Sequence, residues 1–168
     1  MKPLWYYRDS LTGKREYNIT MDMFETYGKY RYDGKVVLDI GADFGLSPAF
    51  FLHQGASKVI AYSPERQKNW LKDPRIEWHR EYWKGQFQEA DILKIDCEGC
   101  EYQRPVDFYF LWYPEALIAI HDLGDERFKR YFEALSKKCV LIYQIENEYM
   151  FYWKKGDKTD WREIYEKN

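Results

Sequence analysis

The sequence lacks any apolar stretch close to the ~20 residues that a membrane span needs. Its first residues, Met-Lys-Pro-Leu-Trp, also lack the apolar region of a signal peptide. A strong charge of either sign is missing too, because 26 basic and 28 acidic residues leave a net charge of −2. This balance gives no general attraction to nucleic acid or to an anionic membrane. We therefore expect a cytoplasmic protein that has no membrane partner and does not bind nucleic acid.

Cysteine is scarce, with three residues in the chain. Three cysteines cannot all pair with one another, and the expected cytoplasmic setting favours free thiols. The spacing Cys97-x-x-Cys100 also occurs in redox pairs and zinc sites, so both interpretations stay open. The interpretation that we favour makes both cysteines small buried apolar side chains.

Aromatic residues, in contrast, make up 20% of the chain. A chain of 168 residues has the length of one domain, whose core does not require so many aromatic rings, so some should lie on the surface. We favour a composition bias or a homodimer interface over a stacking surface for nucleic acid. No room is left for a second catalytic domain, and we expect one domain over residues 1–168.

Short runs rich in Val, Ile and Leu alternate with polar segments after residue 34, as in a parallel sheet covered on both faces. The predicted strands span 36–40, 58–62, 75–78, 92–95 and 116–121. A helix over 126–137 and an antiparallel hairpin of 140–145 with 149–153 follow. The pattern predicts an α/β fold with a Rossmann-like, doubly wound, mostly parallel sheet that ends in an antiparallel hairpin and has its core over 34–154.

Residues 1–30 are predicted to form an aromatic N-terminal extension. A hairpin around Thr12-Gly13 and a short helix near 21–27 are its expected elements. Such an extension either covers the mouth of a substrate site as a lid or packs on the core, and the sequence favours neither role.

The segment from Val36 to Gly45 reads Val-Val-Leu-Asp-Ile-Gly-Ala-Asp-Phe-Gly, an apolar strand followed by a turn with two glycines. Glycine permits backbone dihedrals closed to other residues and leaves space between the main chain and a ligand. Ser47 as N-cap and Pro48 as the first helical residue predict a helix that Gly55 ends. By itself, such a turn indicates a ligand site and a tight strand-to-helix connection equally well.

The pattern Asp39-x-Gly41-x-Asp43-x-Gly45 resembles the first motif of class I S-adenosylmethionine (SAM) dependent methyltransferases, in the form found in the FkbM-like family. A second segment, Leu-Lys-Ile-Asp-Cys-Glu-Gly-Cys-Glu over residues 93–101, resembles that family's signature Leu-Lys-Ile-Asp-Val-Glu-Gly-Ala-Glu. The resemblance extends over about residues 33–123. It implies the class I methyltransferase fold, SAM as cofactor and methyl transfer as activity.

The resemblance implies that the glycine turn and the ends of the next strands bind the cofactor. The residues assigned to cofactor binding are Asp39, Gly41, Ala42, Asp43, Gly45, Ser63, Glu65 and Glu81. The family's acidic residue after the second strand is replaced here by Ser63-Pro64-Glu65, so we expect Glu65 to bind the ribose hydroxyls, with Ser63 as the weaker alternative. Candidates for the adenine edge are His79, Glu81 and Tyr82.

The catalytic candidates are Asp96, Glu98 and His121. Side chains alternate along a strand, so Lys94 and Asp96 share one face of a central strand, where charge is costly unless it is paired. His121 follows the fifth strand and titrates near neutral pH, as a general base would, although a structural role is the alternative. We expect no metal ion; the alternative, similar to catechol-type O-methyltransferases, places magnesium on Asp96 and Asp122.

Together with the resemblance, these residues predict a SAM-dependent methyltransferase that methylates a hydroxyl of a small molecule or glycan. In-line displacement at a sulfonium needs mainly positioning of the acceptor and removal of one proton. A noncatalytic module that binds SAM or a nucleotide is the alternative. A dinucleotide-dependent oxidoreductase would need G-x-G-x-x-G, and the spacing from Gly41 to Leu46 does not match it.

Overall fold

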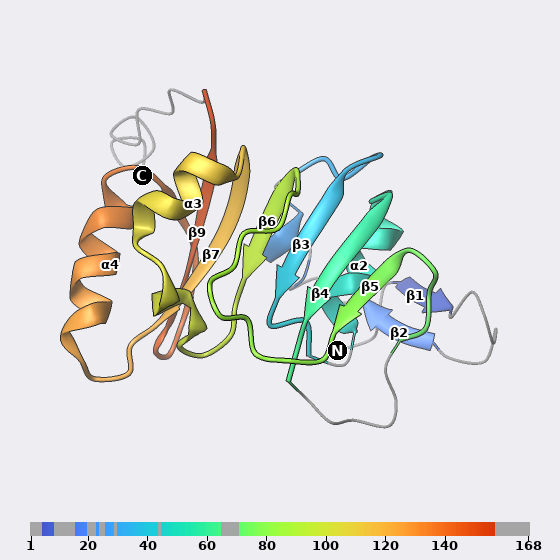
Figure 1. Ribbon diagram of the computed structural model, residues 1–168, viewed down its shortest axis with the longest axis horizontal. Coiled ribbons are helices and arrows are strands. Elements are labelled where there is room, and N and C mark those ends of the chain that lie inside the picture. Colours follow the sequence, from blue (N-terminus) through green and yellow to red (C-terminus); the bar gives the residue numbers. More distant parts are fainter. Residues whose placement is uncertain are drawn as a thin grey trace.

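The computed structural model describes residues 5–8, 16–19, 23, 26–28, 30–43, 45–64 and 71–156. Within these residues, seven strands form one sheet in the order β5-β4-β3-β6-β7-β9-β8 (Figure 1). The strands are β3 (Val36–Ile40), β4 (Lys58–Tyr62), β5 (Ile76–His79), β6 (Ile92–Ile95), β7 (Glu115–His121), β8 (Val140–Ile145) and β9 (Glu148–Lys154). Strands β3 to β7 are parallel, and β9 runs antiparallel to both of its neighbours. The predicted fold class is therefore confirmed.

The order of the strands creates a reversal in the middle of the sheet. The chain begins the sheet at β3, continues outward to β4 and β5, and then returns to place β6 on the other side of β3. In an open parallel sheet, ligands bind where the strand order reverses, outside the carboxyl ends of the strands. The ends of β3 and β6 therefore mark the expected site.

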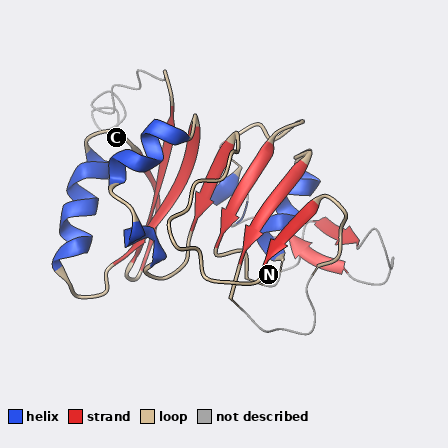
Figure 2. Ribbon diagram, viewed as in Figure 1, coloured by secondary structure: helices blue, strands red, loops and turns tan. Residues whose placement is uncertain are grey.

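Helices cover the sheet on both faces (Figure 2). Alternation along β3 sends Val37 into one apolar cluster, with Phe50 of α2 (Leu46–His53), and Leu38 into the other. The second cluster also contains Tyr109 of α3 (Val106–Trp112) and Leu135 of α4 (Glu126–Ser136). Because both faces are covered, β6 and β7 are buried along their whole length, which explains why their sequences are apolar except for Lys94 in β6 and the terminal residues Glu115 and His121 of β7.

Helix α2 begins differently from the prediction. Its N-cap is Gly45 and its first residue is Leu46, so the prediction of Ser47 as N-cap was wrong. The Ser47 hydroxyl instead donates a hydrogen bond to Asp39 Oδ2 at 2.6 Å, which links the helix to the end of β3. Asp39 is completely buried, so its carboxylate needs donors from the protein, and the Ser47 hydroxyl is one of them.

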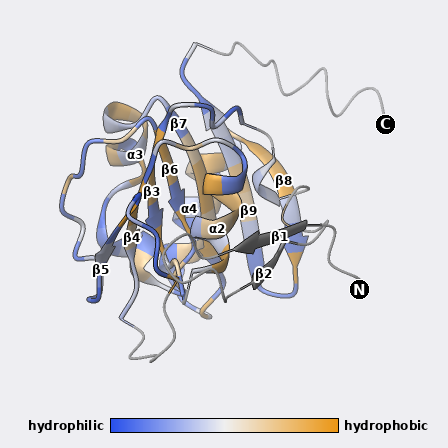
Figure 3. Cartoon of the chain, turned by 90° about the vertical axis from the view of Figure 1, so that its right-hand side faces the viewer, coloured by the Kyte–Doolittle hydropathy of each residue, from blue (hydrophilic) through white to orange (hydrophobic). Residues whose placement is uncertain are grey.

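The N-terminal extension contains an antiparallel pair of strands, β1 (Trp5–Arg8) and β2 (Glu16–Ile19), which lies beside α2 (Figure 3). The predicted turn at Thr12-Gly13 and most of the predicted helix near 21–27 lie outside the described residues. Further along, the buried Tyr30 donates its hydroxyl to the carbonyl of Ala116 on β7 at 2.7 Å. This part of the extension therefore packs on the core. No helix among the described residues is long and apolar enough to cross a membrane.

Candidate functional site

The turn after β3 is fixed by backbone contacts on both sides. The amides of Gly41 and Ala42 both donate to the carbonyl of Tyr62, at the end of β4, at 3.0 Å. Gly41 has φ +82°, and a Cβ at this position would lie 1.7 Å from the carbonyl oxygen of Asp96. The absence of a side chain at Gly41 thus lets the ends of β3 and β6 touch.

A buried ion pair between Lys94 and Asp39 stabilises this turn. Lys94 Nζ lies 3.0 Å from Asp39 Oδ1 and donates to the carbonyl of Gly41 at 2.8 Å. Both side chains are almost completely buried. Burial alone would lower the pKa of Lys94, but the charge of Asp39, followed by Tyr27 and Asp96, raises it above its ordinary value. Lys94 therefore stays protonated, and Asp39 holds the turn through this lysine.

A cavity of about 500 Å³ lies at the carboxyl ends of β3, β4 and β6. Its wall brings together several residues that the sequence assigned separately to cofactor binding and to catalysis. These residues are Gly41, Asp43, Ser63 and Glu81 from the first group and Asp96 and Glu98 from the second. Tyr82 and Trp83 add aromatic surface to the wall. One cavity thus joins the two halves of the predicted site.

The remaining predicted cofactor residues have other positions. Those that do not line this cavity are Asp39, Ala42 and Gly45. Gly45 packs against Leu71, which a Cβ would approach to 2.6 Å. Glu65 lies outside the described residues, so its role stays a prediction. His79 also does not line the cavity; its ring stacks on Tyr62, with centroids 4.4 Å apart, and its Nε2 lies 2.8 Å from a Glu77 oxygen.

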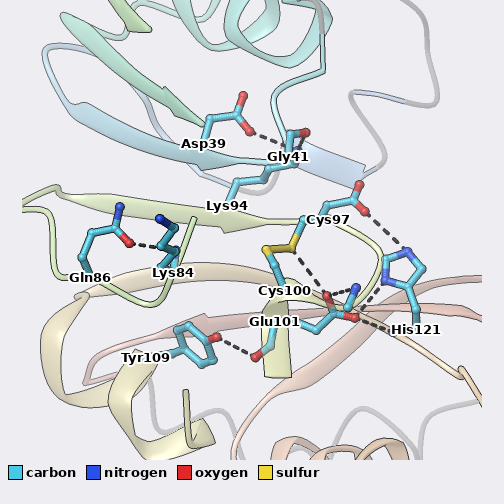
Figure 4. The surroundings of a disulfide bond; sticks show 12 residues. Asp39, Gly41, Lys84, Gln86, Lys94, Cys97, Cys100, Glu101, Tyr109 and His121 are labelled. Atoms are coloured by element: carbon cyan, nitrogen blue, oxygen red, sulfur yellow. Dashed lines mark hydrogen bonds and ion pairs between the residues drawn. A yellow bond between two sulfur atoms is a disulfide. The ribbon is translucent and has the colours of Figure 1, made fainter. Parts of the chain in front are cut away.

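His121 is held by Glu101, a residue that the sequence analysis did not assign. Glu101 is completely buried in the short 3-10 helix η1 (Cys100–Gln103). Its Oε1 accepts the backbone amide of His121 at 3.0 Å and lies 3.0 Å from the ring Nδ1 (Figure 4). The signal for this role was the final glutamate of the segment resembling the family signature, but the contact crosses 20 positions of sequence. The Glu101 carboxylate fixes the ring, so that Nε2 faces the other carboxylates.

Two carboxylates face the Nε2 atom of His121. Asp96 Oδ1 lies 3.6 Å away and Glu148 Oε2, at the start of β9, lies 4.0 Å away. Ligand-type atoms of these three side chains lie within 4.8 Å of one another. Asp122, the other predicted magnesium ligand, instead accepts the amide of Gly124 at 2.9 Å and is exposed.

The surrounding carboxylates change the titration of His121. Burial alone would lower its pKa, but the hydrogen bond and charge of Glu101, then Asp96 and Glu148, raise it above the ordinary 6.5. Burial raises the pKa of Glu148, and Asp96 raises it further. The arrangement therefore favours the protonated imidazole, and His121 can act as a base only above its raised pKa.

Cys97 and Cys100 form a disulfide, with their Cα atoms 5.5 Å apart (Figure 4). The prediction that both are buried apolar side chains was wrong, since each is partly exposed and both line the cavity. The small apolar residues at these positions in the family that the sequence resembles, together with the general preference of cytoplasmic proteins for thiols, favoured that interpretation over the Cys-x-x-Cys spacing. Cys139, in contrast, is a buried free thiol.

Comparison with solved structures supports the fold. The chain is similar to a Burkholderia thailandensis 1,6-didemethyltoxoflavin-N1-methyltransferase, with 17% identity, TM-score 0.51 and coverage of 74% of this chain and 72% of that one. A dimethyladenosine transferase from Plasmodium falciparum is 12% identical at TM-score 0.54, over 78% and 59% of the two chains. A Lactococcus lactis protein provisionally described as a hemolysin is 16% identical at TM-score 0.57, over 82% and 85%. At these identities the likeness concerns the fold.

Sequence comparison finds relatives in viruses. No profile of a known protein family matches the chain, so membership of the FkbM-like family stays a prediction. "Uncharacterized protein 65" of Sulfolobus islandicus filamentous virus is 35% identical over 110 residues, which are 61% of this chain and 69% of that protein. "Uncharacterized protein 158B" of Sulfolobus islandicus rod-shaped virus 1 is 34% identical over 113 residues, 61% and 70% of the two chains. The chain therefore belongs to the same protein family as these two viral proteins.

Proposed function

We propose that this protein is a SAM-dependent methyltransferase. The observation that supports this most is the single cavity that joins the turn after β3 to the carboxylates after β6. SAM carries an ammonium group, a cationic sulfonium, a ribose diol and an adenine ring. Carboxylates of Asp43 and Glu81 offer acceptors for the cationic and hydroxyl groups, while Tyr82 and Trp83 offer surface for the ring. The residues present thus fit this cofactor, which supplies an electrophilic methyl group when it is bound.

We further propose that the acceptor is a hydroxyl of a small molecule or glycan. Asp96 lines the cavity and lies beside His121, so it can bind an acceptor hydroxyl while the imidazole removes its proton. Glu98 in the cavity wall and Glu148 beside Asp96 add negative charge to this side. Because like charges repel, a neutral acceptor is favoured over a phosphate or carboxylate.

A binding experiment tests the cofactor assignment without knowledge of the acceptor. SAM or its demethylated product, S-adenosylhomocysteine, should raise the melting temperature, since a ligand at a hundred times its dissociation constant adds about 2.7 kcal/mol of stability. NAD and ATP should add little. Stabilisation by NAD or ATP alone would contradict the proposal.

Glu81→Gln and Glu89→Gln form a matched pair for the same measurement. Both glutamates are exposed and lie in one loop, but Glu81 lines the cavity and Glu89 does not. Loss of a charge-assisted hydrogen bond at Glu81 should weaken binding by about 1.5 to 3 kcal/mol, while the Glu89 variant should bind like the wild type. Equal binding by both variants would remove Glu81 from the cofactor site.

A noncatalytic SAM-binding module remains the second candidate. The chain lacks the usual acidic residue directly after the second strand of its fold, where Ser63 stands. Binding of SAM without methyl transfer to any sugar, polyol or phenol would favour this second function. Release of S-adenosylhomocysteine in the presence of one such acceptor would favour the enzyme.

A further inference from the structure

The disulfide is the feature of this site that methyl transfer does not require. Both sulfur-bearing residues line the cavity, and each is partly exposed. Cys139 differs in both respects, because it does not line the cavity and is buried. Burial also raises the pKa of its thiol to about 12. Thiol exchange requires access to sulfur, so the chain contains one accessible pair and one inert thiol as an internal reference.

The crosslink closes a loop of four residues, Cys97 to Cys100. Such a short loop loses little entropy on closure, so the bond contributes less to global stability than a bond across a long loop would. Its effect should be local. The two residues inside the loop, Glu98 and Gly99, have φ angles of +52° and +123°, and a left-handed conformation is unfavourable for glutamate. The bond thus helps to hold Glu98, which lines the cavity, in a conformation that it would otherwise leave.

The loop also contacts the carboxylate that holds His121. Glu101 Oε2 accepts the amide of Gly99 at 2.7 Å and lies 3.5 Å from Cys97 Sγ, while Oε1 accepts the amide of His121. A disulfide sulfur has no proton to donate. A thiol at the same distance could donate to Oε2. Reduction of the disulfide would therefore change the hydrogen-bond donors to Glu101 Oε2. The other oxygen of the same carboxylate, Oε1, positions His121.

From these contacts we propose that Cys97 and Cys100 form a reversible thiol–disulfide exchange site in the cavity wall, that small uncharged dithiols are its substrates, and that its oxidised state favours ligand binding in the cavity. The last part rests on the proposed function. In the reaction, a thiolate of the dithiol attacks one sulfur, and the other leaves as a thiolate that takes up a proton. The second thiol of the reagent then displaces the first protein sulfur, which leaves a protein dithiol and an oxidised cyclic reagent.

The charge around the pair supports the preference for an uncharged reagent. Asp96 and Glu98 flank Cys97 in the sequence, and Glu101 follows Cys100. Anionic thiols such as glutathione are repelled by these carboxylates. The same carboxylates disfavour protein thiolates, which favours the disulfide once it has formed.

Thiol trapping on the native full-length protein tests the exchange site without any cofactor. The protein is equilibrated with reduced and oxidised dithiothreitol in varied ratios, treated with N-ethylmaleimide and digested for mass spectrometry. Cys97 and Cys100 should become labelled together and reversibly, while Cys139 stays unlabelled until denaturant is added. Survival of the bond in excess dithiothreitol, or labelling of Cys139 together with the pair, would overturn the proposal, because the bond would then be inaccessible or necessary for the fold.

Calorimetry with S-adenosylhomocysteine tests the second part. Reduced protein should bind about threefold or more weakly than oxidised protein, because the loop must be ordered on binding. The double variant Cys97→Ala/Cys100→Ala should resemble the reduced protein, and Cys139→Ala should resemble the wild type. Equal affinities of the two redox states would overturn the link between the disulfide and binding. Absence of S-adenosylhomocysteine binding in both redox states would contradict the proposed function instead. The thiol-trapping experiment would still show whether Cys97 and Cys100 exchange reversibly.

Discussion

Lys94 shows how much a single buried residue contributes to this site. It neutralises Asp39 and holds the carbonyl of Gly41, so its removal leaves a buried carboxylate without a counter-charge. We predict that Lys94→Met lowers the free energy of unfolding by about 3 to 5 kcal/mol. Urea denaturation measures this loss. The double variant Lys94→Met/Asp39→Asn should recover part of it, and a loss no larger than that of a surface substitution would contradict the buried pair.

A second prediction at this scale concerns the pH dependence of stability. The imidazolium of His121 is stabilised in the folded protein by Glu101, Asp96 and Glu148, so its folded pKa lies above 6.5. A raised pKa contributes stability that is fully present below the unfolded value and is lost as pH rises through the folded value. The stability advantage of the wild type over His121→Gln should therefore shrink as pH rises above 6.5. An advantage that grows over this range would contradict the assignment.

Activity should follow the same titration in the opposite sense. A general base must be deprotonated, so the acidic limb of the rate profile should lie above pH 6.5 if His121 removes the proton. Glu101→Gln removes the negative charge beside Nδ1 and should move this limb to lower pH. His121→Ala should lower the rate by about a hundredfold or more with little change in SAM affinity. A limb that does not respond to Glu101→Gln would assign the base to another residue.

At the scale of secondary structure elements, the contact between the ends of β3 and β6 is the critical one. Gly41 and Gly34 have similar φ angles of +82° and +71°, but a Cβ at Gly34 would meet no atom within 4 Å. We predict that Gly34→Ala costs about 1 to 2 kcal/mol from the left-handed backbone alone. Gly41→Ala should cost clearly more, because its Cβ would displace the carbonyl of Asp96. Equal costs in thermal denaturation would show that the strand ends can separate easily.

Substitutions in the segment after β6 and in the residues after β7 distinguish general-base catalysis from metal catalysis. We predict that methyl transfer survives exhaustive chelation. Asp122→Asn should be nearly as active as the wild type, since the Asp122 side chain accepts a hydrogen bond from the amide of Gly124. Asp96→Asn should be defective because it removes the carboxylate between the cavity and His121. Loss of turnover on chelation with recovery on addition of magnesium would instead favour a metal held near Asp96, His121 and Glu148.

At the scale of the whole molecule, the fold could be predicted from the sequence to a large extent. The apolar runs located the strands of the parallel sheet to within one residue, because strands buried on both faces are mostly apolar. The site was harder to predict, since the sequence does not indicate which side chains from distant segments contact one another. Glu101 acts on a histidine 20 positions away, and Glu148 comes from the final hairpin. The disulfide was missed because the small apolar residues of the resembled family at positions 97 and 100, and the expected cytoplasmic setting, outweighed the Cys-x-x-Cys spacing.

The predicted homodimer is also a property of the whole molecule. Among the described residues, exposed large apolar side chains include Leu111 and Trp112 of α3 and the neighbouring Phe87, whose ring lies 4.9 Å from that of Trp112. If this surface joins two copies, Trp112→Ser should lower the sedimentation coefficient at concentrations where the wild type associates. Sedimentation of the wild type as a monomer at all concentrations would contradict the predicted homodimer.

The position of β9 has a consequence for synthesis on the ribosome. β9 lies between β7 and β8, although β8 precedes it in the chain. A nascent chain that has emerged only as far as residue 145 therefore has β8 but no partner strand through which β8 can join the sheet. The edge of β7 stays uncovered until the residues of β9 emerge, and Glu148 reaches His121 only then. The antiparallel edge of the sheet and the group of carboxylates around His121 are thus completed in one late step, so a chain that stops before β9 should have neither.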